Sequence, residues 1–221
     1  MLEQNIDDRT ITGDLKILVI GNSGAGKTSF VNKWTKDKFE EVYKATIVSE
    51  YSSKVYKYED KLYKINLWDI AGQDHFASVT KAFAKGAHGC ITMSDATQQA
   101  SLDQTVKWKE SLDDSETFAD GGKLPNVLVQ NKADLLKNNE IKDRTELEKF
   151  SKKNGFDAAF KTSAKTGLNI NESMDRLIEI IIKRNKDISA KEMNLNRNTV
   201  SIDPEKNEYK DKYRTKQTGC C

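Results

Sequence analysis

The segment Gly21-Asn22-Ser23-Gly24-Ala25-Gly26-Lys27-Thr28 has the residue types and spacing of a phosphate-binding loop. Its glycines allow backbone N–H groups to point inward around phosphate oxygens. Lys27 supplies a positive charge, and the Thr28 hydroxyl is an oxygen ligand suited to Mg²⁺. The loop follows the apolar run at 15–20 and precedes a helical pattern, as this chemistry requires. We expect nucleotide phosphates to bind Ser23, Gly24, Ala25, Gly26, Lys27, Thr28 and Ser29.

A second candidate motif is Asp69-Ile70-Ala71-Gly72-Gln73, which follows an apolar run. An acid at the end of a strand is commonly a cap or turn residue. In a chain with a phosphate-binding loop, however, Asp69 is better interpreted as the acid that positions the metal. Gly72 allows the backbone to approach a γ-phosphate closely, and Gln73 is the candidate catalytic residue because its amide can orient the attacking water.

The third motif, Asn131-Lys132-Ala133-Asp134, predicts the base. A carboxylate accepts two hydrogen bonds from guanine, at N1–H and the 2-amino group, whereas adenine offers no such pair. Downstream, Ser163-Ala164-Lys165 places the Ala164 N–H where it can meet guanine O6. The alternative is an adenine-nucleotide enzyme such as a small-molecule kinase. It would leave Asp134 without a role.

The rest of the chain predicts an α/β fold that positions these motifs. Buried strand-like runs alternate with amphipathic helical segments, which indicates a mostly parallel sheet. Ser49–Tyr58 and Lys61–Leu67 flank Glu59-Asp60 and read as a hairpin, so one antiparallel edge strand is expected. We predict a P-loop NTPase fold with a six-stranded sheet and flanking helices. The further runs lie at 63–67, 89–93 and 127–129, and the helical segments at 27–35, 101–112, 145–152 and 171–183.

Composition bounds the function. The chain has 221 residues, 36 basic and 34 acidic side chains and a net charge of +2, which disfavours nucleic acid as a partner. We detect neither an apolar run that would span a bilayer nor a secretory signal, so a cytosolic protein is expected. Cys90 reads as a buried apolar residue. We predict a flexible extension at 1–13, one nucleotide-binding domain at 14–186 and a flexible polar tail at 187–221.

These motifs, in this order and spacing, resemble the Ras superfamily of small GTPases over about residues 14–186. Within it the chain most resembles the Rab family, through Ser23, the segment Tyr43-Lys44-Ala45-Thr46-Ile47, Trp68 before Asp69, and the terminal Cys220-Cys221. Trp108, with Leu112-Asp113, resembles the Rab branch of lysosome-related organelles.

The resemblance implies further roles. Thr46 would ligate Mg²⁺ and contact the γ-phosphate, Tyr43 would border the nucleotide, and Phe39 would cover the guanine face. The chain would cycle between GTP and GDP states, with slow hydrolysis because no arginine is suited to act in cis. Implied partners are a guanine nucleotide exchange factor, a GTPase-activating protein, a GDP-dissociation inhibitor or escort protein, and effectors of the GTP state. A monomer is expected. The implied effector surface is Tyr51, Trp68 and Phe83.

Departures from the Rab pattern keep a second reading open, a module that holds GTP but barely hydrolyses it. Val48 stands where Rab proteins normally have glycine, and Asp74-His75 follows Gln73 where Rab proteins commonly have Glu-Arg. For Cys220 and Cys221, a metal site or a vicinal disulfide is disfavoured. The resemblance implies double geranylgeranylation, since two lipid chains anchor a protein stably where one does so marginally. The expected location is the cytoplasmic face of an endosomal or vesicular membrane, with a cytosolic pool.

Overall fold

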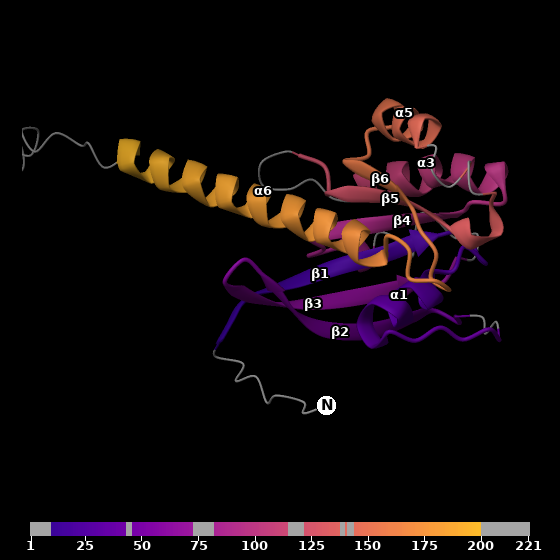
Figure 1. Ribbon diagram of the computed structural model, residues 1–221. Helices are drawn as coiled ribbons and strands as arrows, with labels where there is room; N and C mark the ends of the chain where they lie inside the picture. The colour runs from indigo at the N-terminus through magenta and orange to yellow at the C-terminus, as the bar shows by residue number, and fades with distance from the viewer. Residues whose placement is uncertain are drawn as a thin grey trace, which may run out of the picture. The chain divides into compact units, whose positions relative to one another are not determined.

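The computed structural model describes residues 10–42, 46–72, 82–114, 122–137, 140 and 144–199, with 190–199 described by backbone alone. Six strands form one sheet in the order β2-β3-β1-β4-β5-β6 (Figure 1). The elements in chain order are β1 Ile11–Gly21, α1 Lys27–Lys36, β2 Ser49–Tyr58, β3 Lys61–Ile70, β4 Gly89–Asp95, α3 Gln99–Asp113, β5 Asn126–Asn131, the 3₁₀ turn Ala133–Leu135, α5 Thr145–Lys153, β6 Ala158–Lys161 and α6 Ile170–Thr199.

The expected fold is confirmed. β1 pairs in parallel with β3 and β4, β4 with β5, and β5 with β6. β2 lies at the edge and pairs antiparallel with β3 through the expected hairpin, whose turn residue Glu59 has a φ of 53°. Parallel strands need long crossover connections, and helices supply them here, which accounts for the alternation seen in the sequence.

Alternating side chains of the buried strands pack against helices on opposite faces of the sheet. Ile17 and Val19 belong to the same cluster as the buried faces of α1 and α6, whereas Leu18 and Ile20 belong to a cluster with α3. A smaller cluster joins α3, β5 and α5 around Leu128. The buried residues of α1, namely Lys27, Phe30, Val31 and Trp34, recur at helical spacing, so its apolar side faces the sheet.

Two expected boundaries differ from the structure. β1 begins at Ile11, inside the segment expected to be a flexible extension, because that segment continues the β1–β3 pairing as far as the Ile11–Leu62 partners. α6 continues to Thr199, past the expected start of the tail at 187. The sequence has neither glycine nor proline between Gly167 and Pro204, so no strong helix breaker ends α6 earlier. Contacts divide the chain into units at 1–182 and 183–221, and α6 contributes to both.

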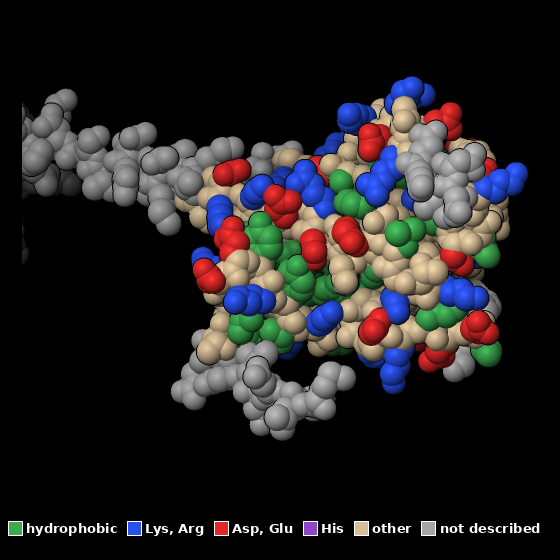
Figure 2. Space-filling model, viewed as in Figure 1, with side chains coloured by type: hydrophobic (Ala, Val, Ile, Leu, Met, Phe, Trp, Pro, Cys, Tyr) green, Lys and Arg blue, Asp and Glu red, His purple; other side chains and the backbone are tan. Residues whose placement is uncertain are grey.

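Because these strands are parallel, the carboxyl ends of β1, β3, β4, β5 and β6 lie on the same side of the sheet. Ligands bind beyond these strand ends in folds of this kind. Asp69 is part of β3 rather than following it, and Asn131 is the last residue of β5. On the molecular face seen in Figure 2, basic and acidic side chains are interspersed.

Candidate nucleotide-binding site

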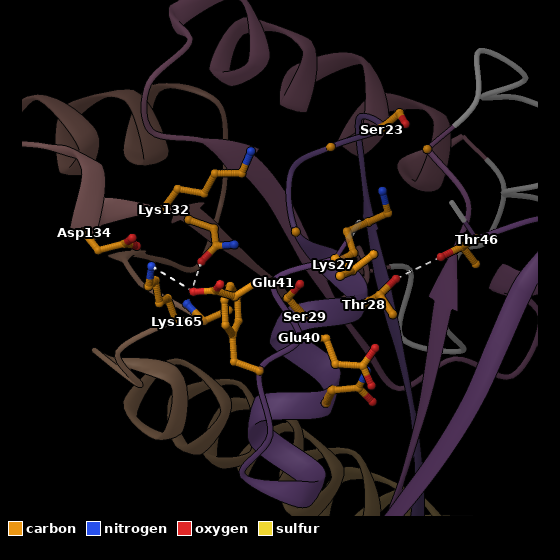
Figure 3. Close-up of a pocket in the computed structure, with 18 of the residues that line it drawn as sticks. Ser23, Lys27, Thr28, Ser29, Glu40, Glu41, Thr46, Lys132, Asp134 and Lys165 are labelled. Atoms are coloured by element: carbon orange, nitrogen blue, oxygen red, sulfur yellow. Dashed lines mark hydrogen bonds and ion pairs between the residues drawn. The ribbon is translucent and has the colours of Figure 1, made fainter. Parts of the chain in front are cut away.

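A cleft of about 580 Å³ lies at the carboxyl ends of the parallel strands. Figure 3 shows Thr28, Thr46 and Lys27 at one end, and Lys132, Asp134 and Lys165 at the other. The residues that line it come from the loop after β1, from α1, from the segment before β2, from β2 itself, from the end of β5, and from the loops after β3, β5 and β6. They are Ser23, Gly24, Gly26, Lys27, Thr28, Ser29, Asn32, Phe39, Glu40, Glu41, Val42, Thr46, Glu50, Gly72, Asn131, Lys132, Asp134, Leu135, Ala164 and Lys165.

The loop after β1 has the geometry of an anion cradle. Gly26 has a φ of 85° and precedes the first residue of α1, so the N-terminal N–H groups of this helix open into the cleft. A Cβ on Gly26 would lie 2.4 Å from the Asn131 side-chain nitrogen. Lys27 Nζ donates to the carbonyl oxygens of Gly21 and Asn22, each at 2.9 Å. Burial lowers the pKa of Lys27 to about 8, against the opposing effect of the Asp69 charge.

Oxygen atoms converge at the same end of the cleft. The Thr28 hydroxyl donates to Asp69 Oδ2 at 2.5 Å and lies 2.9 Å from the Thr46 hydroxyl. Asp69 is 1% exposed, and its Oδ1 is buried with no hydrogen-bond partner among the described residues. Burial raises the pKa of Asp69 to about 6, although the Thr28 hydrogen bond and the Lys27 charge oppose the shift. Two hydroxyls beside a buried carboxylate with an unpaired oxygen suit a hard cation such as Mg²⁺.

The opposite end carries groups suited to a base. Asp134 accepts a hydrogen bond at Oδ1 from the Ser163 hydroxyl, at 2.5 Å, which fixes the carboxylate. Lys132 has a φ of 67°, and its Nζ donates to Asp95 Oδ2 at 2.7 Å, which anchors its long side chain beside the cleft. Lys165 Nζ lies 3.5 Å from Glu41 Oε1 and joins the loop after β6 to the segment before β2 (Figure 3).

Asn131 connects the two ends of the cleft. Its Nδ2 donates to the Ala25 carbonyl at 3.0 Å, and its Oδ1 accepts from the Ala164 N–H at 3.1 Å and from the Thr162 hydroxyl at 3.2 Å. The side chain is 2% exposed, so none of these bonds is readily replaced by water. Asn131 thus ties the phosphate loop to the loop after β6.

The cleft brings together most of the residues that the sequence predicts. Three described residues predicted to contact nucleotide or metal do not line it: the side chain of Ala25 packs in the core, Ser163 is fully buried and donates to Asp134, and Asp69 is buried behind Thr28, whose hydroxyl donates to it. Tyr43, Gln73, His75, Cys220 and Cys221 lie outside the described residues. Sequence reasoning missed six lining residues. Leu135 could have been predicted because it directly follows Asp134. Asn32 could have been predicted because it lies one helical turn after Thr28. No sequence pattern marked Glu40, Glu41 and Val42, which reach the cleft through loop geometry, or Glu50, which lies near the start of β2.

The three aromatic residues expected to form an effector surface contact one another. The ring centroids of Tyr51 and Trp68 are 5.6 Å apart, as are those of Trp68 and Phe83.

Val48 does not require a glycine conformation, because its φ is not positive and its carbonyl accepts the Ala71 N–H at 3.0 Å. The departure from the Rab pattern at this position therefore leaves the backbone unstrained.

Comparison with known proteins decides the family, because the Ras family pattern matches residues 16–183. The chain belongs to the Ras family. It is 37% identical to the human Ras-related protein Rab-7L1 over 169 residues. The aligned region covers 76% of this chain and 82% of the relative. It is 38% identical over 170 residues to Rab-32A of Dictyostelium discoideum, covering 76% and 78%. It is 34% identical over 183 residues to Rab-32 of Mus musculus, covering 82% of each.

The expected likeness to the Rab family, including its lysosome-related branch, is thereby confirmed. This Ras-family protein is a Rab-like small GTPase, a GTP hydrolase of a class that acts in membrane trafficking. Ras-family members bind guanine nucleotides, and Mg²⁺ is the metal that they usually bind with them. Within the described residues, no helix is both long enough and apolar enough to cross a membrane.

Proposed function

We propose that this small GTPase is a Mg²⁺-dependent switch whose phosphates bind beside Lys27 and whose guanine binds beside Asp134. The proposal rests on one cleft that joins both groups of residues. At one end lie the oxygen atoms of Thr28 and Asp69, and at the other lies the carboxylate of Asp134, held by Ser163. We assign the phosphates to the 23–29 loop and Gly72, with Tyr43 bordering the nucleotide.

Charge supports the phosphate assignment. Lys27 and Asp69 are both buried, and burial disfavours the charged form of each, as the lowered pKa of Lys27 and the raised pKa of Asp69 record. A phosphate beside the ammonium and a divalent cation beside the carboxylate would stabilise both charges. Thr28, Thr46 and Asp69 would hold Mg²⁺. When bound, Mg²⁺ neutralises charge that develops on the phosphate oxygens.

The base assignment rests on a fixed acceptor. Ser163 holds one oxygen of Asp134, so the carboxylate presents a defined edge to guanine N1–H and the 2-amino group. Phe39, Lys132 and Leu135 line the same cleft and would contact the base or the ribose. Lys165 completes this end of the cleft. The Ala164 N–H donates to Asn131 Oδ1 in this structure, and it would meet guanine O6 by sharing or exchanging that acceptor when the base binds.

For hydrolysis we assign Gln73 as the residue that aligns the attacking water. None of the described residues lining the cleft is an arginine, which supports slow unaided turnover and an arginine supplied by a GTPase-activating protein. Loss of the γ-phosphate would remove the contacts of Thr46 and Gly72, and so release the two segments that carry them. An exchange factor would then open the site for reloading.

The output of the switch would be effector binding on Tyr51, Trp68 and Phe83. We propose that residues 187–221 link the nucleotide-binding domain to lipids on Cys220 and Cys221. A GDP-dissociation inhibitor or escort protein would cover these lipids in the cytosolic pool. The active form would act as a monomer on the cytoplasmic face of an endosomal or vesicular membrane.

The test is single-turnover GTP hydrolysis with and without a cell extract. Gln73→Leu should slow hydrolysis at least about tenfold, because water positioning is lost while binding is kept. Gln99→Leu is the matched control, since it makes the same exchange on the exposed surface of α3 and should leave the rate unchanged. Equal rates for Gln73→Leu and wild type would contradict the role of Gln73. A wild type that does not hydrolyse GTP even with extract would favour the GTP-holding module.

A further inference from the structure

Trp108 makes a long-range side-chain hydrogen bond that leads from α3 to the phosphate loop. Its Nε1 donates to Asn22 Oδ1 at 2.9 Å across 86 residues of sequence. The indole is 2% exposed and belongs to the apolar cluster that also holds Ile70 and Leu112. Its ring is therefore fixed by packing, while its only polar atom is directed at the residue where the loop leaves β1.

Asn22 in turn holds the parts of the loop that the phosphates would contact. Its carbonyl oxygen accepts from Lys27 Nζ at 2.9 Å and from the Ala25 N–H at 3.2 Å. The loop is also pressed against Gly72: the Ser23 N–H donates to the Gly72 carbonyl at 3.1 Å, and a Cβ on Gly72 would lie 2.4 Å from the Asn22 carbonyl carbon. A shift of Asn22 would therefore move Lys27 and disturb the contact with Gly72.

A second tryptophan shows that packing alone does not demand such a contact. Trp34, on α1, is also 2% exposed, and its Nε1 is buried with no partner for a hydrogen bond in the part of the chain that the structure describes. The fold tolerates that unpaired N–H, so the pairing of Trp108 with Asn22 is a specific feature of the site rather than a requirement of the core.

We propose that Trp108 is a positioning residue for nucleotide retention, acting through its indole N–H on Asn22 and thereby on Lys27. The inference rests on the proposed binding of a guanine nucleotide at this loop. A hydrogen bond of this kind contributes a factor of about five to an equilibrium constant. The bond would slow nucleotide release by that factor, because the loop must move for the phosphates to leave.

The test measures release of a fluorescent GDP analogue in the presence of Mg²⁺. Trp108→Phe keeps most of the ring packing and removes the N–H, and should speed release about fivefold. Trp34→Phe is the matched control, because it makes the same exchange at an equally buried position without breaking a bond. It should change release less than about twofold. Asn22→Ala should match Trp108→Phe, and the double variant should be no faster than either single one.

Equal release rates for Trp108→Phe and Trp34→Phe would overturn the inference, and so would multiplicative effects in the double variant. If Trp108→Phe does not fold, Asn22→Ala decides alone, because it removes the acceptor and leaves the core intact. An unchanged rate in Asn22→Ala would then refute the inference. A nitrogen-15 spectrum adds a direct signature: the Trp108 indole N–H signal should shift in Asn22→Ala and the Trp34 signal should not. If wild-type protein binds no guanine nucleotide, the proposed function fails and this inference fails with it.

Discussion

Asn131→Ala should weaken nucleotide binding far more than it weakens the fold. The side chain makes three buried hydrogen bonds, to the Ala25 carbonyl, the Ala164 N–H and the Thr162 hydroxyl. At about 1 kcal/mol for each bond, their loss amounts to about 3 kcal/mol. Two of the three bonds hold backbone groups on either side of the cleft, in loops that can relax when no nucleotide is present.

Most of this free energy should therefore appear as lost affinity. Since about 1.4 kcal/mol corresponds to a factor of ten, we expect GDP to bind between about tenfold and about hundredfold more weakly. Isothermal titration of nucleotide-depleted protein in excess Mg²⁺ measures the Kd, and thermal unfolding of the same samples measures the change in stability.

Asn126→Ala supplies the matched control, because Asn126 is 1% exposed at the opposite end of the same strand. Its Oδ1 accepts from the Thr92 hydroxyl at 2.9 Å. It should lower the Tm and leave the Kd for GDP within about threefold of wild type, since no group that it holds lines the cleft. If the two variants change the Kd equally, the argument that Asn131 braces the site is refuted.

Three further predictions follow from single contacts. Asp134→Asn should weaken GDP binding at least about hundredfold and strengthen the binding of xanthosine diphosphate, because an amide complements the 2-oxo group of xanthine. Competition binding measures the ratio of the two affinities, and an unchanged ratio would contradict the assignment of Asp134 to the base. Gly72→Ala should abolish tight GTP binding, because its Cβ would lie 2.2 Å from the Ser23 nitrogen. Gly86→Ala, whose Cβ would meet nothing within 4 Å, should keep GTP binding and lower only the Tm, because the φ of 69° at Gly86 strains any other residue. Burial lowers the pKa of His88, so the unfolded chain takes up a proton more readily than the folded one. The free energy of unfolding should therefore fall as the pH drops below about 6.5. Urea unfolding should show a steeper fall of this free energy with pH in wild type than in His88→Gln.

The sequence predicted the parts of the fold that local pattern controls. The apolar run at Leu15–Ile20, the hairpin about Glu59-Asp60 and the helical spacing of Met174, Leu177 and Ile181 all correspond to observed elements. Boundaries were less accurate where no residue type marks an end. The alternation at Ile11–Gly13 is too short to stand out, and α6 has no breaker near Lys186.

For the site, motif residues were predictable because their chemistry fixes their type. Contacts between motifs were not, because they depend on how loops from distant strands meet. Asn131 was assigned to the base motif, yet the structure shows it bonded to the Ala25 carbonyl of the phosphate loop. Glu41 reaches the cleft only through the path of the segment before β2, where it meets Lys165.

If this cleft is the nucleotide site, the protein binds a guanine nucleotide there and hydrolyses GTP. The most direct measurement is to denature the purified protein and identify the released nucleotide by chromatography, before and after loading with GTP and Mg²⁺. We expect guanine nucleotide at close to one per chain, with bound GTP converted to GDP over time. Adenine nucleotide in the cleft, or none after loading, would contradict it.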